Sequence, residues 1–260
     1  MPRFRPMGWS TRLNISDRMM SNLLDIAVSA HGGLDRWNRI RTIGADLAVG
    51  GALWAGKGQP GVFENGRYQA ETRAQRATLT RFGALNHNVR FSPERLVLET
   101  ATGDVIETRD NPRAAFAGHV NETPWDRLHA AYFNGYALWT YLMQPFLYTY
   151  PGFAVEEIEP WDENGETWRR LKATFPDETV SHTREQISYF GPDGLLRRHD
   201  YAVDVLGGAV GAQYVGDYRT VDGIVVPHRR TVYPLDPNNH KLAEPVLVTI
   251  EIGKVEFGRS

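Results

Sequence analysis

Histidine, tyrosine and arginine side chains recur at every second position in two segments near the C-terminus. LLRRHDYAV contains Arg197, His199 and Tyr201, and IVVPHRRTV contains His228 and Arg230. In a β-strand, alternate residues point to the same face of the sheet. If both segments are strands, these groups lie along one face. Imidazoles transfer protons near neutral pH, and guanidinium groups bind carboxylates or phosphates.

The aliphatic residues that share these alternate positions indicate which face this is. They are Leu195, Val203, Ile224, Val226 and Val232. We therefore expect this side to line an apolar interior with a polar middle, which is the usual chemistry of a small-molecule pocket. Ile187 and Tyr189 share one side of the preceding strand and are assigned to the same wall. The alternative is that these residues face solvent and that Arg198, Asp200 and Arg229 point inward.

Two histidines on one wall are compatible with three kinds of chemistry. They could relay protons, bind a metal ion together with a third ligand, or hydrogen-bond the polar end of a bound molecule. No HxH, HExxH or similar spacing supports a metal. We therefore predict no metal site and no cofactor. His199, His228 and Tyr201 are the candidate catalytic residues.

The segment TPWDRLHAAYFNGYALWTYLMQPFLYTY, residues 123–150, predicts the helix that closes this interior. Thr123 is predicted as the N-cap, Pro124 suits the first helical position, and Pro145 should end the helix. The helix is apolar on nearly all sides, so we expect it to be buried. Polar residues in its first half argue against a membrane span.

Several rings of this segment extend the candidate site. The spacing of the rings from Tyr132 to Trp139 is compatible with core packing and with lining a pocket. His129 lies three residues after Asp126, so the two side chains are expected to pair on the first helical turn. His119 precedes the helix, at the expected mouth of the cavity. The predicted ligand-binding residues are Arg197, Arg230, Tyr189, Tyr132, Tyr136, Trp139, His129 and His119.

Most of the remaining chain is predicted to form strands. Residues 1–14 are expected to be a flexible arm, followed by a helix that ends at the Gly32-Gly33 pair. Strands are predicted over 42–50, 61–72, 77–82, 87–92, 96–100, 105–109, 153–161, 166–175, 185–190, 195–205, 211–220, 224–233 and 245–257. The expected fold is α+β, a single domain over 1–260 in which a curved antiparallel half-barrel wraps a central buried helix, with an N-terminal helix beside it.

Composition excludes several classes of partner. The formal net charge is −2, from 29 basic and 31 acidic residues, which gives no electrostatic basis for nucleic-acid binding. The chain has no cysteine, so disulfides and thiolate chemistry are excluded. No signal peptide is visible in MPRFRPMGWSTRLNISDRMM, so we expect a cytoplasmic protein without stable membrane insertion, or a periplasmic one if the start is misassigned. The oligomeric state is not indicated by the sequence.

Four segments resemble the family of the bacterial lipoprotein carriers LolA and LolB. They are AHGGLDRW, WRRLKATFP, SYFGPDGLLRRHDY and GDYRTVDGIVVPHRRTVY. The resemblance extends over about residues 30–255 and is strongest over 166–233. It implies an antiparallel half-barrel whose open side is covered by helices, around an apolar cavity that holds acyl chains in the carriers. Unlike the exported members, the sequence shows no recognisable signal segment and contains no cysteine for lipidation, so we do not expect the envelope-transport role.

Two functional hypotheses follow from these patterns. The first is binding of a hydrophobic or amphipathic small molecule, such as a lipid, between half-barrel and helix, with Arg197 or Arg230 holding an anionic head. The second is a cofactor-independent lyase, isomerase or hydrolase acting on a hydrophobic substrate in the same cavity. In the second hypothesis His199, His228 and Tyr201 supply acid and base.

Overall fold

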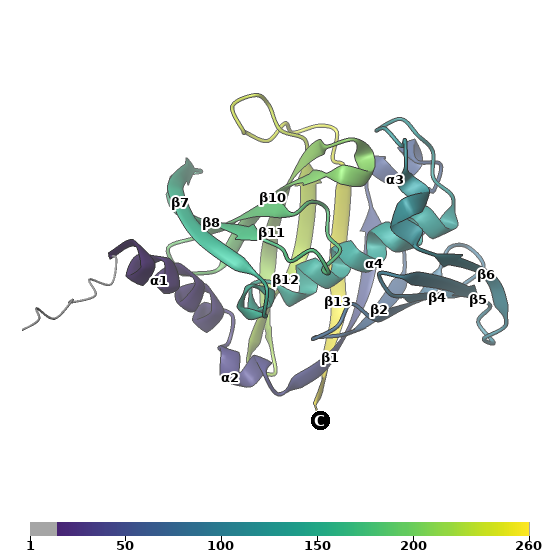
Figure 1. Cartoon of the computed structure of the whole chain (residues 1–260), viewed down its shortest axis with the longest axis horizontal. Helices are drawn as coiled ribbons and strands as arrows, with labels where there is room; N and C mark the ends of the chain where they lie inside the picture. Colours follow the sequence, from purple (N-terminus) through teal and green to yellow (C-terminus); the bar gives the residue numbers. More distant parts are fainter. Residues whose placement is uncertain (1–14, 260) are drawn as a thin grey trace, which may run out of the picture.

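In the computed structural model, residues 15–259 are described, with side chains from Leu23 onward, and a single sheet of thirteen antiparallel strands dominates this part of the chain (Figure 1). The predicted arm, 1–14, lies outside the described residues. The strands are β1 (Ile40–Gly50), β2 (Gly66–Glu71), β3 (Ala77–Phe82), β4 (His87–Phe91), β5 (Arg95–Glu99), β6 (Val105–Asp110), β7 (Ala154–Glu163), β8 (Glu166–Thr174), β9 (Glu185–Phe190), β10 (Leu196–Val203), β11 (Ala209–Val221), β12 (Ile224–Tyr233) and β13 (Val248–Arg259).

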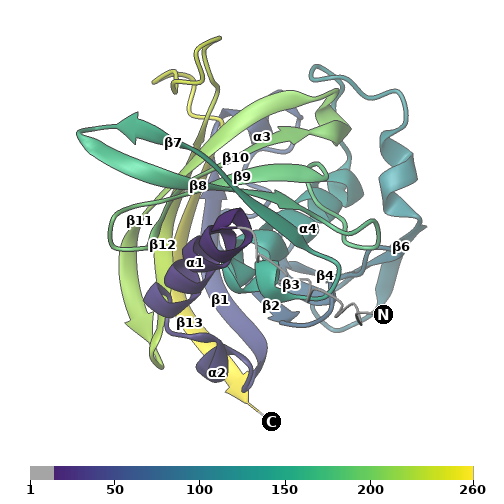
Figure 2. The ribbon, with the colours of Figure 1, turned by 60° about the vertical axis from the view of Figure 1, so that its left-hand side comes forward.

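The strand order shows two meanders joined side by side. It runs β6-β5-β4-β3-β2-β1-β13-β12-β11-β10-β9-β8-β7, so each strand pairs with its sequence neighbour except where β1 meets β13. That junction extends from Ile40, opposite Arg259, to Gly50, opposite Thr249. The sheet curves around the central helix α4 (Arg127–Met143), as Figure 2 shows. The predicted α+β fold, a curved antiparallel sheet around one buried helix, is therefore confirmed.

Helix α4 is buried along its whole length after the first residue. Every residue from Leu128 to Met143 is buried except His129, because the concave face of the sheet covers it. The helix begins three residues later than the predicted start. Its N-cap is Asp126 and not Thr123, because Asp126 and His129 form a reciprocal capping box. Asp126 Oδ1 accepts a hydrogen bond from the His129 amide at 2.8 Å.

Shorter helices close the ends of the curve. They are α1 (Ile15–Ala30), α2 (Leu34–Trp37), α3 (Ala52–Gly56) and the 3-10 segments η1 (Pro112–Phe116), η2 (Phe146–Thr149) and η3 (Asp204–Leu206). Trp37 of α2 stacks on Phe146 of η2 with ring centroids 4.3 Å apart, which ties the N-terminal helices to the end of the α4 segment. Helix α3 was not predicted from the sequence; Trp54 from this helix packs against Trp125 and Phe133.

Among the described residues, no helix combines the length and the apolar character needed to cross a membrane.

The contact between α4 and β4 predicts a stability effect. A Cβ atom at Gly135 would overlap the Phe91 ring, while Tyr68 OH donates a 2.8 Å hydrogen bond to the Gly135 carbonyl. We expect Gly135→Ala to destabilise the protein, because overpacking costs about 1–3 kcal/mol and exceeds the ~1 kcal/mol gain in helix propensity. Urea unfolding followed by circular dichroism measures this difference.

Gly56→Ala is the matched control, because a Cβ atom there meets no atom within 4 Å. Equal or higher stability of Gly135→Ala relative to the wild type would show that α4 does not pack this tightly against the sheet.

Candidate functional site

Strands β9 and β10 are largely buried on both faces, whereas β12 is fully buried on one face only. One face is concave and turned toward α4, and the other is convex, where the loop between β12 and β13 contacts it through Asn239 and His240. His199, Tyr201, His228 and Arg230 lie on the concave face, as the alternation predicts. Neither of the two sequence alternatives anticipated that the opposite face of β9 and β10 would also be buried.

Four polar residues form a row across the concave face, which we call the polar band: Ser188, His199, Gln213 and Arg230. His199 of β10 lies directly opposite Ser188 of β9 and Gln213 of β11. Arg230 of β12 lies opposite Val215 and next to Gln213 on the diagonal. All four side chains are at most 1% exposed. The register of three hairpins therefore brings together four polar groups that are dispersed over more than forty residues of sequence.

The C-terminal part of α4 covers the polar band with few hydrogen bonds. Arg230 donates to Gln213 Oε1 at 2.8 Å and to the Tyr141 carbonyl at 2.6 Å. Ser188 Oγ lies 2.7 Å from the hydroxyl of Tyr148. Within the described part of the chain, both ring nitrogens of His199, Gln213 Nε2 and Arg230 Nε have no partner. Buried polar groups are rarely left in this state.

The charge of Arg230 is not balanced by a neighbouring acid. Among the described residues, no carboxylate lies within 4.0 Å of its guanidinium. Burial lowers the pKa of Arg230 to about 10, so the side chain still carries its charge at neutral pH. Burial, and then the charge of Arg230, lower the pKa of His199 to about 3, so its imidazole is neutral there.

A chain of hydrogen bonds borders the polar band. His182 lies with Nδ1 3.3 Å from the Tyr136 hydroxyl and Nε2 2.7 Å from the Tyr141 hydroxyl, and Tyr141 donates to Tyr201 at 2.6 Å. Burial raises the pKa values of Tyr136 and Tyr141 well above the usual value. Burial and nearby positive charge lower the pKa of His182. At neutral pH this chain therefore consists of neutral groups.

An apolar cavity of about 80 Å³ lies next to this chain. Most of its lining is aliphatic or aromatic and comes from β1, α3, α4 and strands β10 to β13. The lining includes Val49, Leu53, Trp54, Phe133, Ala137, Leu138, Tyr141, Tyr201, Val203, Leu206, Ala209, Val232, Val248 and Ile250. Tyr201 follows His199 by two residues on the same face, and Val232 lies opposite Gln213 and two residues beyond Arg230, so the cavity directly adjoins the polar band.

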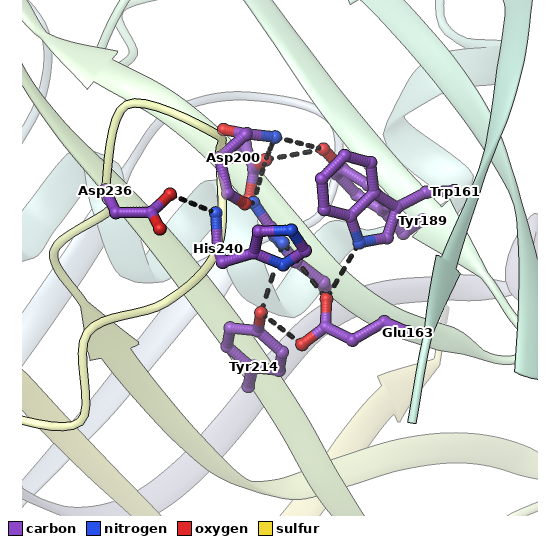
Figure 3. Close-up of polar contacts among 9 residues, drawn as sticks. Trp161, Glu163, Tyr189, Asp200, Tyr214, Asp236 and His240 are labelled. Carbon is purple, nitrogen blue, oxygen red and sulfur yellow. Dashed lines mark hydrogen bonds and ion pairs between the residues drawn. The ribbon is translucent and has the colours of Figure 1, made fainter. Parts of the chain in front are cut away.

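The convex face carries a different cluster, drawn in Figure 3. Arg198 binds Asp200 through two hydrogen bonds of 2.7 and 2.8 Å and reaches Glu163 Oε2 at 3.1 Å. The rings of Trp161, Tyr189 and Tyr214 surround its guanidinium, with centroids 4.8–5.5 Å from Arg198 Cζ. The Asn239 carbonyl accepts from Arg198 at 2.8 Å and ties the covering loop to the sheet. Two carboxylates thus balance this buried arginine.

Two predicted ligand-binding residues belong to this convex side. Tyr189 donates to Asp200 Oδ2 at 2.6 Å and faces away from α4, because Ser188 is the inward residue of β9. Arg197 pairs with Asp193 and Glu166. A β-bulge between Leu196 and Arg198 places Arg197 out of the alternation. The prediction that Arg197 and Tyr189 share the face of His199 is wrong.

His228 is also separate from His199, although both are on the concave face. His228 Nδ1 lies 2.8 Å from the Ile252 carbonyl. On β12 the residue that aligns with the row of His199 and Gln213 is Val232, and His228 comes four positions before it. The expected pair of neighbouring histidines is therefore not formed. His182, in the loop between β8 and β9, is the histidine that stands beside Tyr201, with stacked rings 4.1 Å apart.

The aromatic residues of α4 divide between the two halves of the sheet. Trp139 donates to the carbonyls of Glu71 and Ala74, so it packs on the first meander. Tyr132 packs among Phe91, Phe116 and Tyr136. Of the three predicted rings, Tyr136 alone reaches the His182 chain.

His129 and His119 lie together at the start of α4, away from the polar band. Their ring centroids are 4.8 Å apart, and both pack on Phe116. His129 also completes the cap with Asp126. The role of these residues in ligand binding stays a prediction.

Four residues of this site were not among the predicted catalytic or ligand-binding residues: His182, Ser188, Gln213 and Tyr141. His182 lies in a loop without periodicity, so no pattern indicated its position. The position of Gln213 could have been predicted from the alternation in its strand, because Gln213 shares the inward side with the apolar residues Val215 and Ala209. No cluster of three or more His, Cys, Asp or Glu side chains arranged to hold a metal is found among the described residues.

Comparison with known proteins gives a likeness in fold. No protein-family model matches the chain, and no curated protein has a similar sequence. A LolA superfamily protein from Nitrosomonas europaea superposes with a TM-score of 0.51 at 8% identity, covering 93% of this chain and 94% of that chain. A DUF1329 family protein from Desulfovibrio piger gives a TM-score of 0.46 at 10% identity, covering 92% of each chain. The first of these two likenesses shows that the chain has the LolA-like fold that the sequence resemblance implied.

The neutral, buried state of His199 predicts a pH dependence. The pKa of His199 in the folded state lies below its unfolded value of about 6.5, so the unfolded state binds the proton first as the pH falls. The free energy of unfolding therefore decreases as the pH drops from about 6.5 toward 4. We expect His199→Gln to flatten this decline, by at most about 1.4 kcal/mol per pH unit. Urea unfolding at a series of pH values measures it.

His87→Gln is the control for loss of an imidazole, since His87 is a half-buried residue of β4. A pH slope in His199→Gln identical to that of the wild type would contradict the buried neutral imidazole.

Proposed function

We propose that the protein binds a hydrophobic or amphipathic small molecule between α4 and strands β10 to β13. The observation that carries this proposal is the apolar cavity beside the polar band. Ligand pockets combine a mostly apolar wall with a few polar groups that orient the ligand, and this arrangement has both. The LolA-like fold supports the proposal, since the sequence resemblance to the lipoprotein carriers implies an apolar interior of the kind that holds acyl chains in them.

The cavity must enlarge to admit such a ligand. Its volume of about 80 Å³ is far below the roughly 300–1,000 Å³ of ordinary ligand pockets. The rim of the cavity is formed by α3, the residues around Asn121, and the turn from η3 into β11. Val210 in this turn is 51% exposed. In this proposal these short elements move apart while α4 stays in place. Each Å² of apolar surface that the ligand buries then contributes about 25 cal/mol.

The enzyme hypothesis stays a prediction with less support. Acid–base catalysis works best when the pKa values of the groups lie near the working pH. Burial shifts the pKa of His199 down to about 3 and raises the pKa of Tyr201, so both shifts lead away from neutrality. No contact joins His199 to His228 among the described residues. The cytoplasmic location likewise stays a prediction from the sequence.

Binding of a neutral apolar probe tests the proposal. N-phenyl-1-naphthylamine fluoresces when it leaves water, so titration of the protein with this dye should give a saturable signal with one site per chain. Ala209 lines the cavity and is partly buried, and Ala209→Trp fills the space that the dye would enter. We expect this variant to weaken binding by at least about tenfold, or about 1.4 kcal/mol.

Ala101→Trp is the matched control, because Ala101 is an exposed residue of the turn between β5 and β6. It adds the same indole to the surface and should leave the dye affinity unchanged. Dye binding that never saturates, or that is equal in both variants, would rule out this cavity as the binding site.

A further inference from the structure

We infer that the ligand carries a carboxylate that Arg230 binds, while its hydrocarbon chain occupies the apolar cavity. The inference rests on the proposed function and specifies its ligand as a single-chain amphiphile with one negative charge. It is carried by the unbalanced charge of Arg230, by the unused hydrogen-bonding groups around it, and by its place beside the cavity.

The charge argument comes from comparing the two buried arginines of this sheet. Arg198 on the convex face is 0% exposed and has Asp200 and Glu163 as partners. Arg230 on the concave face is 1% exposed and has, among the described residues, only the neutral acceptors of Gln213 and Tyr141. An uncompensated charge in the core is unfavourable, because the ion loses its hydration without gaining a counter-ion. An anion delivered by a ligand removes this penalty.

The unused polar atoms of the band suit an oxygen ligand. Arg230 Nε, Gln213 Nε2 and one nitrogen of neutral His199 are all donors, and none has a partner within the described chain. His199 and Gln213 are directly opposite each other on neighbouring strands, and Gln213 already contacts Arg230. Three neighbouring residues therefore offer donors for the two oxygens of a carboxylate.

The number of charges distinguishes a carboxylate from a phosphate. The polar band has one positive charge, since the pKa of His199 is lowered and its imidazole is neutral. One guanidinium balances a carboxylate fully, whereas a phosphate monoester carries about −1.5 to −2 at neutral pH. A phosphate would therefore bring excess negative charge into the core. We assign the site to a monoanionic carboxylate.

The path between head and chain passes Tyr141 and Tyr201. Both line the cavity, and both contact residues of the polar band: the Tyr141 carbonyl accepts from Arg230, and the Tyr201 and His199 rings are 5.2 Å apart. Their hydroxyls share a 2.6 Å hydrogen bond. In the bound state these two rings lie along the first carbons of the chain, and the remaining chain continues between α4 and β11.

The experiment compares laurate with dodecanol, which have chains of the same length and differ in the charge of the head. Displacement of N-phenyl-1-naphthylamine at mildly alkaline pH gives both affinities. We expect the wild type to bind laurate at least about tenfold more tightly than dodecanol. Acetate alone should not displace the dye, because it has no chain to fill the cavity, and dodecyl phosphate should bind less tightly than laurate.

Gln213→Glu is the decisive variant. The Gln213 Oε1 atom is already 2.8 Å from Arg230 Nη1, so a glutamate of the same shape supplies the missing counter-ion from within the chain. We expect this variant to unfold at a higher urea concentration than the wild type and to lose the preference for laurate. Gln186→Glu is the matched control, since Gln186 is also buried but has no contact with Arg230. It should be less stable and keep the preference.

Arg230→Met provides a second test that does not depend on a new ion pair. We expect the laurate-to-dodecanol affinity ratio to fall to about one. An equal affinity for laurate and dodecanol in the wild type, or a preference for laurate that persists in Gln213→Glu and Arg230→Met, would overturn the assignment of Arg230 while leaving the cavity as a binding site. Absence of binding by both lipids and by the dye would overturn the proposed function as well.

Discussion

The burial of α4 is the constraint on which the rest of the structure depends. A helix with aromatic and aliphatic side chains on nearly all sides must be covered on nearly all sides. A flat sheet can cover only one side of a helix, so the thirteen strands curve until both meanders contact it (Figure 2). The same residues that pack the helix, such as Tyr141 and Phe133, then become walls of the interior cavity. Core packing and the candidate pocket are therefore one feature.

The two faces of the second meander, strands β7 to β13, differ in how the charge of a buried arginine is balanced. On the convex face, the Arg198 guanidinium is held by acids, rings and a loop carbonyl, an arrangement that fixes the 234–247 loop to the sheet (Figure 3). On the concave face, the hydrogen-bond acceptors that the described residues offer to Arg230 are all neutral. The ion pairs of Arg198 stabilise the folded chain itself. The charge of Arg230 becomes more favourable only when an anion binds next to it. This asymmetry supports a role in recognition for the concave face.

Strict periodicity was the part of the sequence that predicted structure best. Ile224 to Val232 alternates without interruption, so Arg230 and His228 were placed on the correct face. The rule failed at Arg197 because a single bulged residue shifts the alternation, and composition does not reveal a bulge. It also failed for Tyr189, since β9 is buried on both faces and its apolar residues do not mark one side. The row of Ser188, His199, Gln213 and Arg230 depends on cross-strand register, which period-two alternation alone leaves open.

The position of β13 has a consequence for how the molecule is assembled. This strand is the last of the thirteen in sequence, yet it occupies the middle of the sheet, between β1 and β12. During synthesis, each meander can form from neighbouring segments, but the two remain unjoined until β13 has emerged from the ribosome. Until then β1 and β12 each present an open edge with unpaired backbone groups, which is a site for intermolecular association. Nascent chains of this protein are therefore expected to need protection at these two edges, and a chaperone that binds extended segments would meet that need.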